Sequence, residues 1–238
     1  MITACLNGDR TRRQHPAVPQ TADELARAAK ESVEAGASMV HVHPRDESGR
    51  ETLEARLVDA VTAIRTLSPG LRVSVSTRDG IIDGPAAKVA HVSGWPPPRL
   101  GGPDCASVNW HEDGAVEVAS ALEGRGIGVE AGLWTPEAAR ELVAGSWARL
   151  VERVLVEVIP GATPGEDGSA AARCILAALG GPSAPVLVHG EQDWAWPVLR
   201  WARGAGFDVR IGLEDTCRLP SGREARDNAE LVAVAAGT

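Results

Sequence analysis

The sequence is poor in cysteine, in long apolar runs and in basic charge, and each shortage excludes a class of protein. A run of about 18 apolar residues, the minimum for a transmembrane helix, does not occur, so we expect no membrane span. The formal net charge of −8 argues against nucleic acid or an anionic membrane as the main partner, because both require a basic face. No CxxC pair occurs, which argues against a zinc ribbon or a thioredoxin-like motif, among the four cysteines Cys5, Cys105, Cys174 and Cys217.

Signals for export and for several common enzyme classes are also missing. The N-terminal residues lack a basic region followed by an apolar one, so we expect no signal peptide, a cytoplasmic location and free thiols. The sequence contains no P-loop, no GxSxG and no HExxH motif. Any catalytic site must therefore be assembled from residues that the fold brings together.

The sequence does contain a regular alternation of two patterns. Short apolar runs rich in Val and Ile alternate with longer Ala-rich stretches that predict helices. One such stretch, 21–35, begins with a Thr21–Glu24 capping box, and another, 136–144, begins at Pro136. Near-continuous apolar strands separated by helices predict a parallel sheet covered on both faces. We expect eight strands, at 2–6, 38–43, 72–77, 104–109, 128–133, 153–158, 184–189 and 208–213.

Eight such units in 238 residues match the size of a (β/α)8 TIM barrel, an α/β fold. We expect one barrel domain over residues 1–238, with a doubly wound open sheet as the alternative. The proline-rich stretch 94–98 predicts a long loop. We expect the last helix at 223–236.

His41 and His43 are the sharpest feature at the predicted strand ends, where a barrel carries its chemistry. Residues two apart on a strand point to the same face, so the two imidazoles form half of a metal site. Glu214, at the end of the eighth strand, could supply the third ligand. Two His and one carboxylate suit Zn²⁺, with Fe²⁺, Co²⁺ or Mn²⁺ also compatible. The alternative is that one His faces the barrel core and the other caps a loop.

Arg210 and Asp215 form a second candidate pair at the eighth strand. Arg210 is expected to point into the barrel, where a buried guanidinium requires a carboxylate from the protein or from a substrate. Its alternative partners are Glu130 and Glu157, two isolated acids on apolar strands. Asp215 is a general-base candidate beside Glu214, or else a helix cap or loop carboxylate.

Further polar residues occur at the same predicted strand ends. Ser76 and Thr77 could donate hydrogen bonds to an oxyanion, or bond locally within a turn. The fourth strand carries Ser107 and Asn109. His189 could be a further metal ligand, a substrate contact or a strand-end histidine with a structural partner.

These residues lie in motifs with a recognisable order along the chain. The N-terminal part has Asn7-Gly-Asp-Arg-Thr and the segment His41-Val-His-Pro-Arg-Asp. Ser76-Thr77 and Pro103-Asp-Cys-Ala-Ser107 follow, and the eighth strand has Val209-Arg-Ile-Gly-Leu-Glu-Asp215. In these motifs the chain resembles the β-keto acid cleavage enzymes over nearly its whole length. The HxHxRD and RxGxED elements are the most specific part of the resemblance.

The resemblance implies a zinc-containing TIM barrel that condenses a β-keto acid with acetyl-coenzyme A, giving acetoacetate and a new acyl-coenzyme A. It implies that His41, His43 and Glu214 bind one zinc ion per chain. It also implies that Asp215 is the base, oriented by Arg210, and that the enzyme is a homo-oligomer. Substrate-site positions fall, by the same resemblance, on Ser76, Ser107, Glu130 and Asp9, where the family has Glu in place of Asp9.

The loop after the seventh strand departs from the family pattern, because an acidic His189-Gly-Glu191-Gln-Asp193 replaces a basic, amide-rich loop. Coenzyme A carries phosphates that basic residues usually bind, and Arg78 or Arg99 could compensate. Three hypotheses follow. The first is a zinc-dependent β-keto acid cleavage enzyme. The second is a metal-dependent aldolase or hydrolase of a keto acid that does not use coenzyme A. The third is a catalytically silent barrel.

Overall fold

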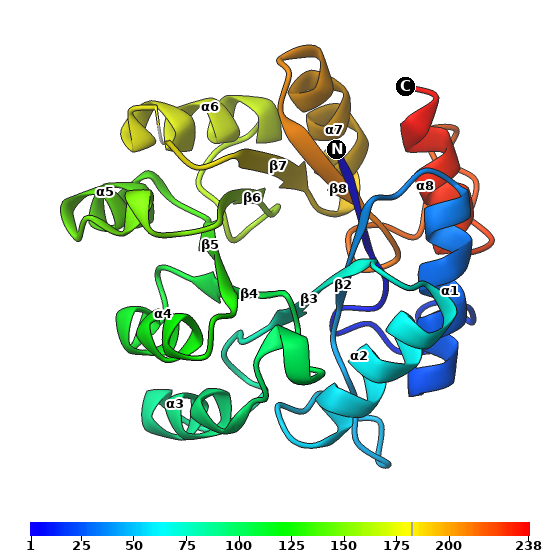
Figure 1. Ribbon diagram of the computed structural model, residues 1–238. Coiled ribbons are helices and arrows are strands. Elements are labelled where there is room, and N and C mark those ends of the chain that lie inside the picture. Colours follow the sequence, from blue (N-terminus) through cyan, green and yellow to red (C-terminus); the bar gives the residue numbers. More distant parts are fainter. Residues whose placement is uncertain (182) are drawn as a thin grey trace.

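Eight parallel strands close into a barrel in the computed structural model, which describes residues 1–181 and 183–238. Each strand pairs with the next along the chain, and β1 also pairs with β8, so the predicted TIM barrel is confirmed and the open sheet is wrong. Figure 1 looks along the barrel, with the helices forming a ring around the strands. The strands are β1 (Ile2–Cys5), β2 (Met39–Val42), β3 (Arg72–Ser76), β4 (Cys105–Asn109), β5 (Gly128–Leu133), β6 (Arg153–Val158), β7 (Val186–Gly190) and β8 (Asp208–Ile211).

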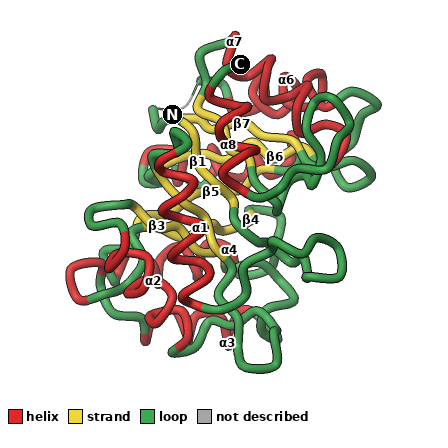
Figure 2. Tube along the Cα trace, turned by 90° about the vertical axis from the view of Figure 1, so that its right-hand side faces the viewer, coloured by secondary structure: helices red, strands yellow, loops and turns green. Residues whose placement is uncertain are grey.

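The strands separate an apolar outer layer from a polar interior. Figure 2 shows the strands enclosed by helices and loops. Side chains alternate along a strand, and the outward-facing residues, such as Val40 and Val73, are fully buried beneath the helices. The interior instead holds charged and hydroxyl side chains, including Glu130 and Arg153, whose carboxylate and guanidinium lie 3.6 Å apart. The main hydrophobic core therefore lies between the strands and the helices, and the barrel lumen is available for polar chemistry.

The helices begin where local signals place their first residues. Thr21 caps α1 in the expected capping box, and Pro136 is the first residue of α5. The sequence interpretation did not identify α4. The predicted start of α8 at 223 is wrong, because Arg218 and Glu224 first pair as an antiparallel bridge and Asp227 then caps the helix. The helices are α1 (Ala22–Glu34), α2 (Arg56–Leu67), α3 (Pro85–Gly94), α4 (Ala115–Gly124), α5 (Pro136–Ala144), α6 (Gly168–Leu179), α7 (Ala195–Gly204) and α8 (Asn228–Ala236).

Three short 3₁₀ helices complete the described structure: Pro98–Leu100, Trp147–Arg149 and Gln192–Trp194. The first of these corrects part of the expected loop, because the last proline of the 94–98 stretch already begins a helical turn. Within the described residues, none of the helices has the length and apolarity required to cross a membrane.

Candidate metal centre and active site

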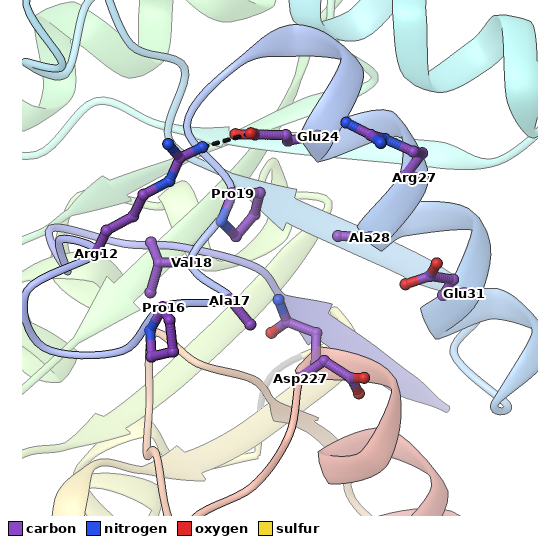
Figure 3. Close-up of a pocket in the computed structure, with 11 residues that line it drawn as sticks. Arg12, Pro16, Ala17, Val18, Pro19, Glu24, Arg27, Ala28, Glu31 and Asp227 are labelled. Atoms are coloured by element: carbon purple, nitrogen blue, oxygen red, sulfur yellow. Dashed lines mark hydrogen bonds and ion pairs between the residues drawn. The ribbon is translucent and has the colours of Figure 1, made fainter.

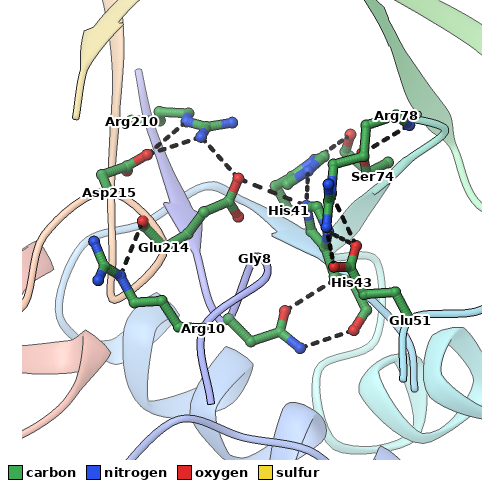
Figure 4. A network of polar contacts seen from close by, with 12 residues as sticks. Gly8, Arg10, His41, His43, Glu51, Ser74, Arg78, Arg210, Glu214 and Asp215 are labelled. Carbon is green, nitrogen blue, oxygen red and sulfur yellow. Dashed lines mark hydrogen bonds and ion pairs between the residues drawn. The ribbon is translucent and has the colours of Figure 1, made fainter. Parts of the chain in front are cut away.

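Two histidines at the end of β2 turn the same ring nitrogen toward one another. The Nε2 atoms of His41 and His43 lie 3.1 Å apart, inside the mouth of the barrel (Figure 4). Each ring is held by a bond at its other nitrogen. His41 Nδ1 lies 2.9 Å from Ser74 Oγ on β3, and His43 Nδ1 lies 2.6 Å from Glu51 Oε2 in the loop after β2.

These second bonds define which nitrogen is free to bind a ligand. Ser74 donates its hydroxyl proton to Glu130, so Ser74 Oγ accepts from the Nδ1–H of His41. The Glu51 carboxylate likewise accepts from the Nδ1–H of His43. Both Nε2 atoms then face the centre of the site, where a metal could bind them once His43 loses its second proton, and bonds of this kind at Nδ1 orient histidine ligands in metalloproteins.

Glu214 completes a three-residue cluster with these histidines. One ligand atom from each of His41, His43 and Glu214 lies within 4.8 Å of the others, and Glu214 Oε1 is 3.6 Å from His43 Nε2. Gly8, with φ of +54°, packs directly against Glu214 and would place a Cβ 2.5 Å from its Cγ. The absence of a Cβ at Gly8 therefore leaves room for the Glu214 side chain where it reaches the two imidazoles.

The spacing and chemistry of this cluster fit a divalent metal such as zinc. Two nitrogens that share a tetrahedral zinc at about 2.0–2.1 Å are separated by about 3.3 Å, close to the 3.1 Å between the two Nε2 atoms. Glu214 Oε2 is buried and has no hydrogen-bond partner among the described residues, which is costly unless a further group binds it. Three protein ligands would leave a coordination position for a substrate, as in catalytic rather than structural sites.

The surroundings of the cluster favour a neutral His41 and an ionised Glu214, but a protonated His43. Burial lowers the pKa of His41 to about 3, so this imidazole is neutral at pH 7. Burial also lowers the pKa of His43, but Glu214 and Glu51 outweigh it and raise the pKa to about 9. Burial raises the pKa of Glu214, yet Arg210, the first of its compensating charges, helps to hold that pKa well below its usual range. A metal that binds here must displace a proton from His43.

Asp215 and Arg210 form an ion pair beside the cluster. Arg210 donates from Nε and Nη2 to Asp215 Oδ1, at 3.1 and 2.8 Å, and from Nη2 to Glu214 Oε1 at 2.8 Å. The expected inward direction of Arg210 is confirmed, but its partners are Glu214 and Asp215 rather than Glu130 or Glu157. Burial raises the pKa of Asp215 above its ordinary value, with Arg210 opposing it. Asp215 Oδ2 has no partner among the described residues.

His189 lies between two carboxylates on the β6–β8 side of the mouth. Its Nδ1 is 3.6 Å from Asp215 Oδ1 and its Nε2 is 3.4 Å from Glu157 Oε2 on the neighbouring strand. The ring is fully buried. His189 is not part of the metal cluster, so it contacts the base candidate rather than the metal ligands. Burial, reinforced by the charge of Asp215, raises the pKa of Glu191 to about 8.

The remaining sequence candidates occupy different levels of the barrel. Ser76 and Ser107 are cross-strand partners and are buried at the end of β3 and on β4. Asn109 donates from Nδ2 to Glu112 Oε1 at 2.8 Å. Thr77 donates its hydroxyl to the Ser107 carbonyl at 2.7 Å, so that hydroxyl has a structural partner.

Glu130 and Asp9 differ most in burial among these candidates, because Glu130 is buried and Asp9 is exposed. Glu130 is fully buried below the histidines and reaches His41 only through Ser74. Burial raises the pKa of Glu130, against the charge of Arg153. Asp9 is exposed and lines a groove of about 640 Å³ over the ends of β1–β3, which also contains Glu51 and Arg78.

Another groove, drawn in Figure 3, lies at the side of the barrel against α1 and the start of α8. Its lining is close to neutral, because acids there offset Arg12 and Arg27, and Arg12 is already paired with Glu24. None of the three metal-ligand candidates lines it. The groove beside Asp9 is not lined by them either, but it contains Glu51, which bonds His43 Nδ1, and it is therefore the better place for a substrate.

Four residues that position the cluster were not singled out from the sequence. Ser74 and Glu51 orient the histidines through their Nδ1 atoms. Asn7 clamps the end of β2, because its side chain accepts from His43 N at 2.9 Å and donates to His43 O at 2.8 Å. Gly8 makes room for Glu214. Their contacts join separate strands and loops, so only the placement of Asn7 and Gly8 at a strand end signalled them.

Comparison with known proteins shows which family and which relatives this chain is similar to. The sequence profile of the beta-keto acid cleavage enzyme family matches residues 1–238. A 3-keto-5-aminohexanoate cleavage enzyme from Acetoanaerobium sticklandii is 26% identical over 257 aligned positions, covering 98% of this chain and 88% of the relative. An enzyme of the same name from Fusobacterium nucleatum is 38% identical over 79 residues, or 32% of this chain and 29% of the relative.

Two further proteins share part of this chain or its fold. A 3-oxoadipate:acetyl-CoA acetyltransferase from Cupriavidus necator is 34% identical over 79 residues, or 32% of this chain and 28% of the relative. The solved ternary complex of ObcA with a C4-CoA adduct and oxalate superposes with a TM-score of 0.71 at 16% identity. That superposition covers 93% of this chain and 63% of ObcA, and at this identity it shows the likeness of the folds.

Proposed function

This chain belongs to the beta-keto acid cleavage enzyme family, and from that premise we propose that it condenses a β-keto acid with acetyl-coenzyme A. In this reaction the acetyl group and the acyl group of the keto acid exchange partners, giving acetoacetate and a new acyl-coenzyme A. The observation that carries the proposal is the juxtaposition of the His41–His43–Glu214 cluster with the Arg210–Asp215 pair at the mouth of the barrel.

We propose zinc as the metal and His41, His43 and Glu214 as its ligands. The donor set of two imidazoles and one carboxylate, the 3.1 Å spacing of the Nε2 atoms and the buried, unpartnered Glu214 Oε2 all support this assignment. When bound, the ion supplies Lewis-acid polarisation of a substrate carbonyl. Ser74 and Glu51 orient the two imidazoles from behind.

Asp215 is proposed as the base that removes a proton from the carbon between the ketone and the carboxylate of the keto acid. Its raised pKa makes the carboxylate a stronger proton acceptor, and Oδ2 has no partner among the described residues. Arg210 holds the other oxygen with two hydrogen bonds, which orients Asp215 and stabilises its charged form between turnovers. His189 Nδ1 lies 3.6 Å from Asp215 Oδ1 on the β7 side, too far for a hydrogen bond.

The proposed substrate contacts come from strands β3 and β4 and from the loop after β1. Ser76, Ser107 and Asn109 are proposed to hold the carboxylate or a developing oxyanion by hydrogen bonding. Thr77 is also proposed as a substrate-site residue because it directly follows β3, although its hydroxyl donates to the Ser107 carbonyl. Asp9 would contact the far end of the keto acid in the groove that it lines. Glu130 would act on the site through Ser74 and His41.

Similarity to two proteins supports acetyl-coenzyme A as the proposed co-substrate. One of them is named as an acetyl-CoA acetyltransferase, and the ObcA complex contains a CoA adduct. A coenzyme A-independent aldolase or hydrolase is the second candidate. The acidic residue Glu191 in the loop after β7 favours it, because that loop offers phosphates no positive charge. Acetyl-coenzyme A dependence of turnover separates the two candidates.

Metal content is the first measurement that tests the proposal. Elemental mass spectrometry of the purified protein should find about one zinc per chain, and the His41→Ala/His43→Ala double variant should contain none. Asp215→Asn should keep the zinc and lose at least about 100-fold in kcat, the usual contribution of a general base. A wild-type protein without zinc, even after zinc is supplied, contradicts the metal assignment. Full activity in Asp215→Asn contradicts the assignment of the base.

A further inference from the structure

A groove on the β7–β8 side of the barrel mouth is lined by three arginines. Arg10 comes from the loop after β1, Arg200 from α7 and Arg218 from the loop after β8, and we call this the basic groove. Its volume is about 450 Å³, within the range of small-molecule sites. The groove adjoins the metal-ligand candidate Glu214, because Arg10 Nε donates to the Glu214 carbonyl at 3.2 Å.

The charge of the basic groove is not neutralised by the protein. Among the described residues, no carboxylate forms an ion pair with Arg10, Arg200 or Arg218, and Asp193 is the single acidic residue in the lining. Arg218 is braced by donating from Nη1 to the Gly222 carbonyl at 2.9 Å. A cluster of three uncompensated guanidinium groups in a chain of net charge −8 indicates a site for a multiply charged anion.

Other basic residues considered for this role are unsuitable. Arg78 lies at the mouth, but its guanidinium already donates from both Nε and Nη2 to the Glu51 carboxylate. Arg99 precedes β4 and lines a groove together with residues that precede β3. It therefore lies at the end of the barrel where the strands begin, opposite the mouth. The groove near Asp9 and the groove near His111 each contain more acidic than basic residues. The basic groove is the favourable one of these for an anion that must also reach the metal centre.

The walls of the basic groove add features that suit a nucleotide phosphate. The first turn of α7 lines it, so the positive end of that helix dipole adds to the arginine charge. Trp196 in the same turn is fixed by a bond from Nε1 to the Arg218 carbonyl at 2.6 Å. That bond ties α7 to the loop after β8, and so connects the two segments that carry Arg200 and Arg218.

We propose that the basic groove binds the phosphates of coenzyme A, with Arg10, Arg200 and Arg218 as the anchoring residues. This inference rests on the proposed use of acetyl-coenzyme A. The thioester of that molecule is separated from its phosphates by a long flexible arm, so the phosphates must bind on the rim while the acyl group reaches the centre. The groove thereby supplies the positive charge that the acidic loop after β7 lacks.

The test compares acetyl-coenzyme A with acetylpantetheine, a truncated thioester without phosphates. In the Arg200→Glu/Arg218→Glu variant, KM for acetyl-coenzyme A should rise about tenfold or more relative to KM for acetylpantetheine, since each charge-assisted phosphate contact is worth about that factor. Adenosine 3′,5′-bisphosphate should compete with acetyl-coenzyme A in the wild type, and increasing salt should weaken it. Arg200→Gln/Arg218→Gln repeats the test with less perturbation if the charge reversal impairs folding.

Arg99→Glu is the control for charge reversal, because it makes half of the double variant's charge change at the opposite end of the barrel. It should leave the ratio of the two KM values unchanged. An unchanged ratio in both double variants, with the wild type active on acetyl-coenzyme A, would overturn the basic groove and leave the proposed function standing. A wild type that cleaves keto acids without any thioester would overturn both the co-substrate assignment and this inference.

Discussion

Replacing Gly8 with alanine should remove the metal while leaving the barrel folded. An alanine Cβ at this position would lie 2.5 Å from Glu214 Cγ, which is closer than real Cβ contacts allow, and 3.1 Å from Glu214 Cβ, which is a tight contact. The backbone at Gly8 is anchored by its neighbours, since Arg45 donates to Gly8 O at 2.8 Å and Asn7 is bonded to β2. The Glu214 side chain is therefore the group that must rotate away from the histidines.

The effect of Gly8→Ala has two parts that can be measured separately, a loss of stability and a loss of zinc affinity. A residue with a Cβ at φ of +54° costs about 1–2 kcal/mol of stability in the left-handed region, whatever its surroundings. Gly70 has φ of +81° and open space around its Cβ position, so Gly70→Ala carries the backbone cost alone. The displacement of Glu214 comes in addition. It should lower zinc affinity on the order of 100-fold, the upper end of what loss of a supporting interaction costs a metal site.

The assay measures urea unfolding of the metal-free proteins and zinc affinity by competition with a chromophoric chelator. Gly8→Ala should lose at least as much stability as Gly70→Ala, because displacing Glu214 also breaks its hydrogen bond with Arg210. Only Gly8→Ala should lose zinc affinity. If Gly8→Ala binds zinc as tightly as Gly70→Ala, then either Glu214 is not a ligand or Gly8 does not position it, and the proposed construction of the metal centre is refuted.

Three further changes test the electrostatics of the site. Glu51→Gln removes the anion that orients His43, so zinc affinity, measured by chelator competition, should fall about 10–100-fold. An unchanged affinity would show that Glu51 does not support this ligand. The native pKa of Glu191, about 8, lies above its unfolded value of about 4.5. Between these two pH values the native state keeps a proton that the unfolded state releases, so stability falls as the pH rises through this range. Glu191→Gln should therefore stabilise the protein by roughly 2–4 kcal/mol at pH 9 and by almost nothing at pH 4, measured by urea unfolding, and equal effects at both pH values would contradict this. Removing zinc with a chelator should lower stability by about 2.7 kcal/mol relative to protein in zinc at 100 times Kd, and no shift in Tm would argue against a bound ion.

The fold followed from the sequence because its signals are local and repeated. Apolar runs of strand length, a capping box at Thr21 and a proline at the start of α5 each act within a few residues, and the eight-unit count leaves few topologies. The start of α8 was misjudged because tertiary pairing there competes with local preference, whereas α4 is an ordinary helix that the sequence interpretation missed. The Arg218–Glu224 bridge, for example, takes up residues that the local pattern favours as helix.

The proposed metal ligands were also within reach of the sequence, because a two-residue spacing on a strand fixes the face. His41 and His43 had to share a direction, and the RxGxED motif placed Glu214 at the strand end next to β1. The partners that make the cluster work were not readable in this way. Ser74 is 33 residues from His41, and nothing in a run of valines and serines distinguishes it from Ser76.

The amino-acid sequence by itself thus determined the barrel, the face on which the histidines lie and the end of the barrel where polar groups collect. Only the tertiary structure decided which carboxylate pairs with Arg210, which hydroxyl supports His41 and which arginines remain without an acid. The reason is physical. Periodicity and capping are set by covalent neighbours, whereas ion pairing and burial depend on distances between strands and loops that are far apart along the chain.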